Sequence, residues 1–308
     1  MRVTVVGAGV IGLSCAIRAA QAGHLVTVAA AKRTPHTTSD VAAAIWFPYL
    51  AEPRDRVQAW GVATLAALRS LAADPTSGVA WRPARIVDPD ADPWWKAGVD
   101  GVHAVPGGAA TGWGHAFHVD VPVVAMPRYM AFLERRARAL GVGFETRQLR
   151  ALRQATGADI VVNASGLGAR ELVGDASMVP IQGQVARLDA RLGEAVLVES
   201  DPPVYAIPRP DGVVVGGTAV RGAESTVPDP AVEADVLQRV TAEVPVLAGA
   251  PIVARAVGLR PGRPTIRLQR VEAGADAPVP IVHCYGHGGS GVTLSWGCAD
   301  EVVRLLNP

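Results

Sequence analysis

The sequence predicts an α/β protein in which a parallel-sheet domain, built from both ends of the chain, is interleaved with an α+β domain that contains a mostly antiparallel sheet. Three observations predict this fold. The chain begins with a strand, a glycine-rich turn and a helix, its middle consists mainly of short strands, and its end combines a strand, a second glycine-rich turn and a helix. Its 308 residues, of which 49% are hydrophobic, suffice for two buried cores.

The first element is a βαβ unit. Arg2 to Val6 is a run of β-forming residues, Gly7 to Gly12 is a glycine turn, and Ser14 to Gln21 has helical periodicity. Gly23 then ends the helix, and Leu25 to Ala30 forms the second strand. Two parallel strands joined by a helix are the basic unit of a nucleotide-binding sheet.

Further helices are expected where apolar residues recur at helical spacing, and further strands where short apolar runs lie between turn residues. The expected helices are 55–73, 127–140, 229–243 and a C-terminal helix that begins after the glycines of 288–291. The expected strands are 81–87, 158–163, 184–188, 195–198, 205–207, 213–215, 265–271 and 279–283, with irregular or antiparallel structure elsewhere in 74–125. Pro210-Asp211-Gly212 predicts a hairpin between two of these strands.

Composition excludes several classes of partner. Lys+Arg 29 against Asp+Glu 28 give a net charge of +1, which provides no general attraction for nucleic acid or an anionic membrane. We expect neither partner, no membrane-spanning segment and a cytoplasmic location. The three cysteines, Cys15, Cys284 and Cys298, are odd in number and lack paired metal-ligand spacing, so we expect no disulfide and no metal site.

The first glycine turn matches the pattern G-x-G-x-x-G and reads Gly7-Ala8-Gly9-Val10-Ile11-Gly12. Glycines between a strand and a helix let the backbone approach a pyrophosphate at the helix N-terminus. A glycine turn without a ligand is the alternative. The acidic residue expected at the end of the second strand is absent, and Lys32 and Arg33 follow instead, so an NADP preference also stays open.

Two other segments have the composition of a cofactor site. Residues 37–49 read T-T-S-D-V-A-A-A-I-W-F-P-Y, so three hydroxyls that can bind phosphate precede a small apolar tract that a flat ring can approach. An N-cap followed by an ordinary helix would have the same pattern. Residues 284–293 read C-Y-G-H-G-G-S-G-V-T, and their amides at the start of the last helix, with Thr293, can hold a second polar group.

Together with residues 258–268, which read G-L-R-P-G-R-P-T-I-R-L, these segments resemble the D-amino-acid oxidase family from the first strand to the last helix. The motifs that carry the resemblance are T-T-x-D-V-A-A, R-P-x-R-P and Y-G-H-G-G-x-G. The resemblance implies an FAD-binding Rossmann-type domain interleaved with an α+β substrate domain containing a mostly antiparallel sheet. We accordingly assign 1–50, 130–178 and 250–308 to the FAD-binding domain, and 51–129 and 179–249 to the substrate domain.

The activity implied by the resemblance is the FAD-dependent oxidative deamination of a D-amino acid. Hydride passes from the substrate Cα to flavin N5, the imino acid hydrolyses to a 2-oxo acid and ammonia, and O₂ reoxidises the flavin to give H₂O₂. FAD is expected to be bound non-covalently. No side chain is needed as acid or base because the substrate reacts as its free amine, so positioning carries catalysis.

The resemblance also implies roles for individual residues. Arg267 falls at the position that binds the substrate carboxylate, Tyr205 donates its hydroxyl to the same carboxylate, and the Gly289 carbonyl receives the substrate amine. A surface ion pair for Arg267 and a core aromatic for Tyr205 are the alternatives. The expected walls of the side-chain pocket are Phe47, Tyr49 and Ile207. The expected FAD contacts are Gly7, Ala8, Gly9, Ile11, Gly12, Thr37, Thr38, Ala44, Ile45, Leu149, Ser165, Gly288, Gly291, Val292 and Thr293.

Two features depart from the family pattern. Residues 198–204 form a shorter loop than the lid of the animal enzymes and contain no second tyrosine, and the acidic ribose residue is missing. The apolar walls favour neutral D-amino acids, as does Ala219, where the D-aspartate-specific branch carries an arginine. His287 is expected to be a structural hydrogen-bonding residue, and Cys15 and Cys298 core thiols.

Other functions stay open from the sequence. A glycine or sarcosine type oxidase shares the expected fold and would have a smaller pocket. An NADP-dependent dehydrogenase and a non-catalytic flavin-binding protein are alternatives of a different class. The expected partners are a small-molecule D-amino acid and O₂, and a homodimer stays open.

Overall fold

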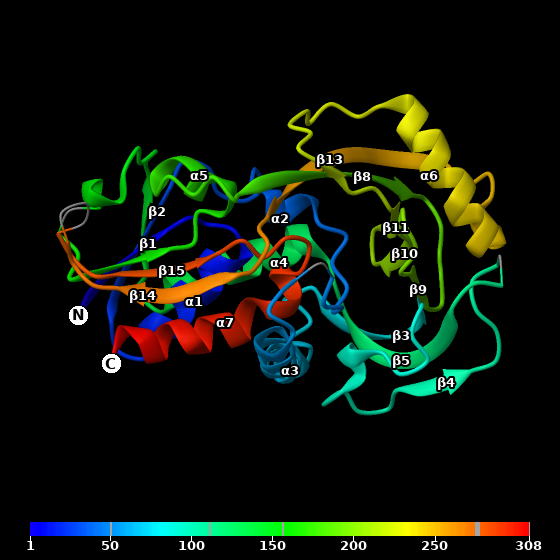
Figure 1. The fold of residues 1–308 in the computed structure, drawn as a ribbon, viewed down its shortest axis with the longest axis horizontal. Helices are drawn as coiled ribbons and strands as arrows, with labels where there is room; N and C mark the ends of the chain where they lie inside the picture. Colours follow the sequence, from blue (N-terminus) through cyan, green and yellow to red (C-terminus); the bar gives the residue numbers. More distant parts are fainter. Residues whose placement is uncertain (50, 111, 156, 275–277, 308) are drawn as a thin grey trace.

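The structure, a computed structural model, describes residues 1–49, 51–110, 112–155, 157–274 and 278–307. These residues form a six-stranded and a nine-stranded sheet, which lie side by side along the long axis of the molecule (Figure 1). The expected α/β class, with one sheet built from both ends of the chain, is confirmed.

The six-stranded sheet is parallel except for one edge strand. Its order is β14-β15-β7-β1-β2-β6, and β14 is the antiparallel member. Val5 on β1 and Val28 on β2 are completely buried, as expected of parallel strands that are covered on both faces. The strands are β1 (Arg2–Val6), β2 (Leu25–Ala30), β6 (Gly143–Thr146), β7 (Ile160–Asn163), β14 (Arg267–Val271) and β15 (Ile281–Tyr285).

A layer of helices packs beside this sheet. The helices are α1 (Val10–Gln21), α3 (Arg54–Leu71), α4 (Met126–Ala139) and α7 (Gly291–Leu306). Helix α1 packs against α4 and α7, and α7 packs in turn against α3 (Figure 1). The α3–α7 crossing is close because Gly297 has no side chain: a Cβ there would lie 2.5 Å from Cα of Trp60. The Thr64 hydroxyl accepts the N–H groups of Trp296 and Gly297 at the same crossing.

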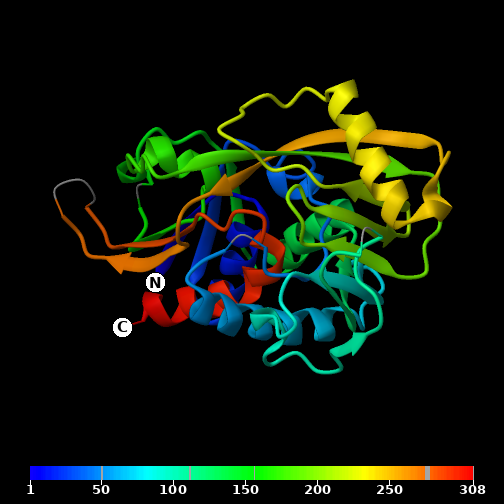
Figure 2. The ribbon, with the colours of Figure 1, turned by 45° about the vertical axis from the view of Figure 1, so that its right-hand side comes forward.

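The nine-stranded sheet has the order β12-β8-β11-β10-β9-β3-β5-β4, and β13 pairs with β8. Its strands are β3 (Val79–Asp88), β4 (His103–Val105), β5 (His115–Val124), β8 (Val179–Leu188), β9 (Ala195–Val198), β10 (Val204–Arg209), β11 (Gly212–Gly216), β12 (Val220–Arg221) and β13 (Ile252–Gly262). All of its pairs are antiparallel except β3 with β9. Strands β8 and β13 run side by side over their whole length (Figures 1 and 2).

Of the remaining helices, two are short and the third packs on the nine-stranded sheet. They are α2 (Thr38–Val41), α5 (Ala169–Leu172) and α6 (Pro230–Glu243), with 3-10 turns at Trp94–Lys96, Leu152–Gln154, Gly166–Gly168 and Pro245–Leu247. Helix α6 packs on β8, β10 and β11 and buries Val236 and Val240 against them. The Asp229 carboxylate caps α6 by accepting the N–H of Ala231.

The sequence did not predict strand β13. Its residues include Gly258, Pro261 and Gly262, which are unfavourable in a strand by local preference. Continuous pairing from Gly262 with Val179 to Ala254 with Arg187 outweighs that preference. Strand β13 is therefore the last strand of the chain in the nine-stranded sheet, and the chain returns to the six-stranded sheet at β14. The division of the chain into two domains stays a prediction.

Helix α1 also differs from the expectation, because it begins at Val10 rather than at Ser14. The glycine turn is therefore only as long as the backbone needs to reverse direction. Gly7, with φ of 113°, adopts a conformation that favours glycine, and its N–H donates to the Ala29 carbonyl at 2.9 Å. The helix consequently starts directly behind the end of β1.

We predict that Gly297→Ala lowers the free energy of unfolding by about 1–3 kcal/mol, because the added methyl group must push α3 and α7 apart. This loss exceeds the gain of ~1 kcal/mol that alanine gives over glycine inside a helix. Gly193→Ala is the control, since its Cβ would meet no atom within 4 Å. Urea unfolding of both variants measures the difference, and equal midpoints would show that the crossing is not tightly packed.

Candidate functional site

The glycine turn between β1 and α1 is packed without side chains. A Cβ on Gly7 would overlap the carbonyl oxygen of Ala164, and a Cβ on Gly12 would overlap the carbonyl oxygen of Gly7. Helix α1 starts after Gly9 and has no side-chain cap of its own on that residue. The turn thus forms a cradle that added side chains would fill, and a close backbone approach by a pyrophosphate requires such a cradle.

Residues of the second segment lie directly beside this turn. The N–H of Val10 donates to the Ser39 hydroxyl at 3.0 Å, so the first turn of α1 meets the start of α2. The Thr37 hydroxyl instead donates to Asp40 at 2.6 Å and Thr38 is exposed. Ser39 is therefore the hydroxyl closest to the α1 N-terminus. The sequence expectation named Thr37 and Thr38 and missed Ser39, although the run of three hydroxyls was the signal.

The apolar part of the same segment runs between the two sheets. Ala44 adopts a left-handed conformation with φ of 58°, which is unusual for a residue with a side chain. Its carbonyl accepts the N–H of Val124 at 2.8 Å, and Ile45 forms a β-bridge with Val123. Strand β5 thus holds the tract in place, with its small side chains at the junction of the sheets.

Two hydroxyls at the start of α7 hold the end of this segment. The Thr293 hydroxyl accepts the N–H of Phe47 at 3.1 Å and donates to the Phe47 carbonyl at 2.9 Å. The Ser290 hydroxyl makes the same two bonds to Tyr49, both at 2.6 Å. Residues 47–49 are therefore held to α7 as if they paired with a strand.

The α7 N-terminus presents free backbone donors. Its N-cap Ser290 makes no side-chain cap, and within the described part of the chain no acceptor is bonded to the N–H groups of Gly291, Val292 or Thr293. Gly288, with φ of 53°, is held by its N–H to the Pro261 carbonyl at 2.9 Å. Such donors are ready to bind an anion or a polar ring edge.

The other expected cofactor contacts lie around the same two helix ends. Ser165 is next to Gly7 in space, and its hydroxyl donates to Asn163 Oδ1 at 2.7 Å. Leu149 packs in a small apolar cluster with Val6 behind the turn. The expected contacts that are buried near these ends are Ala8, Ile11, Ile45 and Val292.

An arginine and a tyrosine face each other on the nine-stranded sheet. Tyr205 on β10 is paired in register with Gly216 on β11, and its ring occupies the space where a Cβ of Gly216 would be. Arg260 on β13 likewise occupies the space beside Gly183 on β8. Burial raises the pKa of Tyr205, whereas the hydrogen bond and charge of Arg260 lower it.

Gly289 and Tyr49 complete this constellation. A Cβ on Gly289 would lie 2.6 Å from Tyr49 Cδ1 and 3.6 Å from Arg260 Cδ, so three elements meet at this point. Burial raises the pKa of Tyr49 to about 12, although the Arg260 charge opposes the shift. Arg260 Nη1 donates to the Thr218 carbonyl at 2.8 Å, which fixes the guanidinium. The structure thus brings together Tyr205, Tyr49 and Gly289 around an arginine.

The expected pocket walls pack beside Tyr205. Ile207 lies two residues further along β10 and therefore on the same face of the sheet. Phe47 stacks edge-on against Trp95, with ring centroids 5.5 Å apart, and Trp95 stacks on Phe117 at 6.0 Å. These side chains are all buried in one apolar cluster, against which Tyr205 packs.

Arg267, the arginine expected beside Tyr205, lies elsewhere. It is on β14, the edge strand of the six-stranded sheet, and its Nη1 donates to Tyr285 Oη at 2.8 Å. The structure therefore does not bring Arg267 next to Tyr205, and Arg260 is the arginine that faces Tyr205. The physical reason is the crossing of the chain from one sheet to the other between β13 and β14, which separates two arginines of one sequence segment.

Arg267 belongs to a network that joins β14, β15 and the segment before β8. Tyr285 Oη donates to Asp175 Oδ2 at 2.8 Å, and Arg263 Nε donates to the same oxygen at 3.0 Å. Partial burial would raise the pKa of Asp175, but hydrogen bonds from Ser177, Tyr285 and Arg263 outweigh it and hold the pKa well below its usual range. The network is therefore structural.

The basic residues that left an NADP preference open have other partners. Arg33 Nη1 lies 3.4 Å from Glu134 Oε1, and its guanidinium lies over the ring of Phe144 at 5.6 Å. A 2′-phosphate would have to displace both contacts. Lys32 is exposed beyond the end of β2.

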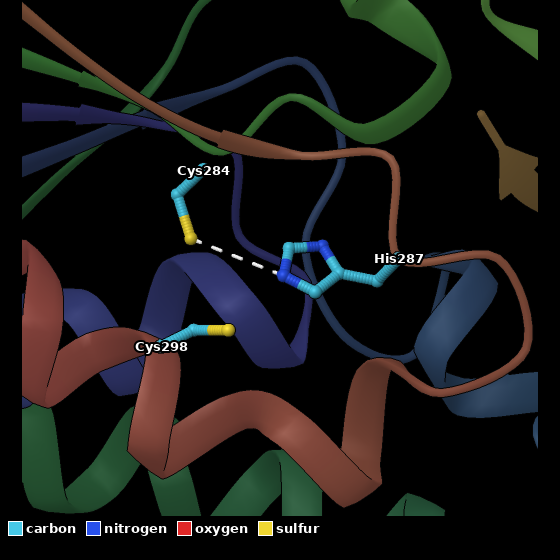
Figure 3. Close-up of side chains that lie close together, drawn as sticks. All are labelled: Cys284, His287 and Cys298. Atoms are coloured by element: carbon cyan, nitrogen blue, oxygen red, sulfur yellow. Dashed lines mark hydrogen bonds between the residues drawn. The ribbon is translucent and has the colours of Figure 1, made fainter. Parts of the chain in front are cut away.

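Two cysteines and a histidine meet beneath the last glycine turn (Figure 3). Cys284, His287 and Cys298 are buried, their ligand atoms lie within 4.8 Å of one another, and Cys284 Sγ is 4.0 Å from His287 Nε2. Burial lowers the pKa of His287 to about 3 and raises that of the Cys298 thiol. Sequence spacing did not predict this cluster, because β15 and α7 bring the residues together. All three groups are uncharged at neutral pH, as in an apolar core.

The glycine turn between β1 and α1 and the free donors of α7 are features typical of α/β proteins of the nucleotide-binding class. The family model described as FAD dependent oxidoreductase matches residues 2–305. The chain belongs to this family. No helix of the described residues has the length and apolarity needed to cross a membrane.

Curated relatives match the chain over its whole length. A D-amino-acid oxidase of Rubrobacter xylanophilus is 44% identical and is matched over 99% of this chain and 95% of that protein. A D-amino-acid oxidase of Streptomyces coelicolor is 38% identical, with 99% and 96% covered. A D-aspartate oxidase of Homo sapiens is 34% identical, with 99% and 94% covered.

A solved structure supports the fold. The glycine oxidase of Geobacillus kaustophilus superposes with a TM-score of 0.81 at 20% identity, covering 99% of this chain and 94% of that one. At this identity the likeness concerns the fold alone.

We predict that acid weakens the Asp175 network. The depressed pKa means that its contribution to stability is complete above the ordinary pKa of ~3.9 and is lost as pH falls through the lower folded-state value. Asp175→Asn should cost about 1–3 kcal/mol at neutral pH and flatten the decline of stability below pH ~4. Urea midpoints measured from acid to neutral pH test this. Asp92→Asn is the control, since its carboxylate is 85% exposed; a parallel decline in both variants would contradict the assignment.

Proposed function

We propose that the protein is an FAD-dependent oxidase of neutral D-amino acids that forms 2-oxo acids, ammonia and H₂O₂. The constellation of Arg260, Tyr205, Tyr49 and Gly289 carries the proposal, because it combines hydrogen-bond donors for a carboxylate with a backbone carbonyl that can accept a hydrogen bond from an amine. The two D-amino-acid oxidase relatives, each matched over nearly its whole length, support it. We include a cytoplasmic location, supported by the three free and buried cysteines.

FAD fits the cradle without a covalent bond in this proposal. Gly7 and Gly9 give the backbone access to a pyrophosphate, with the α1 N-terminus and Ser39 as its donors. The free N–H groups of 291–293 would face the polar edge of the flavin, and the tract from Ala44 to Ile45 would lie along the ring. When bound, the flavin supplies a two-electron acceptor that O₂ reoxidises.

Substrate orientation follows from the donors at the site. Arg260 has guanidinium N–H groups beyond the one bound to Thr218, and a planar guanidinium can grip both oxygens of a carboxylate. Tyr205 keeps its proton, because burial raises its pKa, and adds a neutral donor. The Gly289 carbonyl is the proposed acceptor for the amine. With carboxylate, amine and side chain all fixed, the Cα–H bond can take only one direction.

Positioning is then the main catalytic contribution. His287 is neutral and buried, and Tyr49 and Tyr205 have raised pKa values, so none of these side chains exchanges a proton near neutral pH. In this proposal the substrate reacts as its free amine, and no acid or base residue is assigned. Holding the reacting atoms in place can lower a barrier by about 7–11 kcal/mol.

Neutral side chains fit the surrounding wall. Phe47 and Ile207 are buried apolar residues on the Tyr205 side, and Ala219 follows Thr218 without a charge. An acidic side chain placed against this wall would be desolvated without a cation to pair with it, at a cost of several kcal/mol. The pocket proposed here therefore selects against acidic substrates.

Spectroscopy and an oxygen electrode test the proposal together. We predict that the purified protein shows flavin absorbance bands near ~450 and ~370 nm. It should also consume O₂ with D-alanine or D-valine more efficiently than with glycine, sarcosine or D-aspartate. A higher kcat/KM for glycine or sarcosine would favour the alternative amine oxidase. A colourless protein that binds NADPH would end the flavin proposal.

The two arginines make a matched pair of variants. We predict that Arg260→Ala keeps bound flavin but lowers kcat/KM for D-alanine by at least ~10³-fold, because both the charged contact and the orientation that it imposes are lost. Arg267→Ala should lower thermal stability and change kcat/KM by less than ~10-fold, since it removes only the bond to Tyr285. The reverse order of the two losses would return the carboxylate to Arg267.

A further inference from the structure

Glu199 follows the last residue of β9 and extends from the sheet face that carries Tyr205. Leu197 is paired in register with Tyr205, and paired residues of antiparallel strands lie on one face. Glu199 is two residues further on, and its N–H donates to the Val87 carbonyl at 2.9 Å, so the extended backbone continues. The alternation of side chains therefore places Glu199 on the same face as Leu197 and Tyr205.

The Glu199 carboxyl is half-buried and has no cationic partner. Among the described residues, none donates a hydrogen bond to its side chain or forms an ion pair with it. Its acidic neighbour Asp88 is buried and already accepts Trp95 Nε1 and the N–H of Asp90, both at 2.9 Å. Burial, together with the charge of Asp88, raises the pKa of Glu199 to about 7. Burying a carboxyl without a hydrogen-bond donor or a cation is unfavourable, and a ligand that carries such a group would satisfy it.

Tyr49 links this carboxyl to the proposed substrate site. The pKa of Tyr49 is lowered by the charge of Arg260 and raised by that of Glu199, so both groups lie within electrostatic range of its ring. Leu197 and Ile207 lie on the same sheet face as Tyr205 and belong to one apolar cluster with it. A substrate side chain that extends along this face from Arg260 towards Glu199 would therefore contact apolar groups, as a chain of methylene groups requires.

We propose that Glu199 forms a subsite for the cationic end of a long basic D-amino acid, such as D-lysine or D-arginine. This inference rests on the proposed function and extends its substrate range. A protonated Glu199 accommodates neutral side chains, and an ionised one pairs with an ammonium or guanidinium group. The pair is desolvated on binding, which makes it stronger than an exposed ion pair.

Glu199→Gln tests the subsite, because it keeps the size of the side chain and removes its charge. D-Lysine and D-norleucine have the same four-carbon side chain, to which D-lysine adds a terminal ammonium group. Measured above neutral pH, the ratio of kcat/KM for D-lysine to that for D-norleucine should fall at least ~10-fold, which corresponds to about 1.4 kcal/mol. The value for D-norleucine should stay within ~2-fold, because a neutral side chain gains nothing from the charge.

Asp201→Asn is the matched control for long-range electrostatics. Asp201 lies on the same loop, also acts on Tyr49 by its charge and is exposed, so its removal should leave the D-lysine to D-norleucine ratio nearly unchanged. An equal fall in both variants would overturn the subsite and assign the preference to general charge. An unchanged ratio in Glu199→Gln would overturn it as well.

Binding of two non-oxidisable acids separates this inference from the proposed function. 6-Aminohexanoate has the carboxylate and terminal ammonium of D-lysine without its α-amine, and hexanoate lacks both nitrogens. Calorimetric titration should show tighter binding of 6-aminohexanoate to the wild type and no such advantage in Glu199→Gln. If the protein oxidises no D-amino acid, the proposed function fails, and the same titration still decides whether Glu199 binds the cation. Equal affinities for both acids in the wild type would overturn the subsite.

Discussion

Lack of side chains at a few glycines determines where the functional side chains can lie. The guanidinium of Arg260 occupies the volume that a Cβ on Gly183 would fill, and the Tyr205 ring does the same beside Gly216. Gly289 gives the backbone of the last turn equivalent access to the site. Gly183 and Gly216 lie in strands whose positions are fixed by pairing. The side chains that fill the space beside these glycines therefore have defined positions. The missing side chains at Gly183 and Gly216 thus let Arg260 and Tyr205 face one another.

The cofactor cradle and the pocket wall are mechanically connected. Thr293 and Ser290, at the N-terminus of α7, each bond both backbone groups of a residue in 47–49. The same helix end presents the free N–H groups proposed to face the flavin. Movement of α7 would therefore displace Phe47 and Tyr49, and a ligand that orders the helix end would also order the wall. The hydroxyl groups of Thr293 and Ser290 thus couple cofactor binding to the shape of the substrate pocket, and this coupling requires no contact between these hydroxyls and either ligand.

Local sequence patterns were sufficient for the fold class and for most elements, whereas long-range pairing was not predictable. The β–turn–α start and the glycines before α7 follow from short motifs, whereas the roles of Tyr205 and Gly289 came from the family resemblance. Choosing Arg260 over Arg267 required knowing that the chain changes sheets between them, and strand β13 exists because β8 pairs with it. Ser39 could not be distinguished from Thr37 and Thr38 in the sequence, because all three are adjacent hydroxyl residues. Only the structure shows that the N–H of Val10, in the first turn of α1, donates to Ser39.

Burial decides which groups near the site carry charge. It keeps His287 neutral and the tyrosine hydroxyls protonated, so Arg260 is the fixed cation that the anion constellation presents. A fixed cation beside the amine of a bound amino acid disfavours the ammonium form by repulsion. Neither Tyr49 nor Tyr205 can take the proton of that amine near neutral pH, because burial raises the pKa of both hydroxyls. Burial also raises the pKa of Glu199, so its carboxyl tends to keep a proton when no cation is near. A ligand that brings a cation to this carboxyl would favour its ionised form.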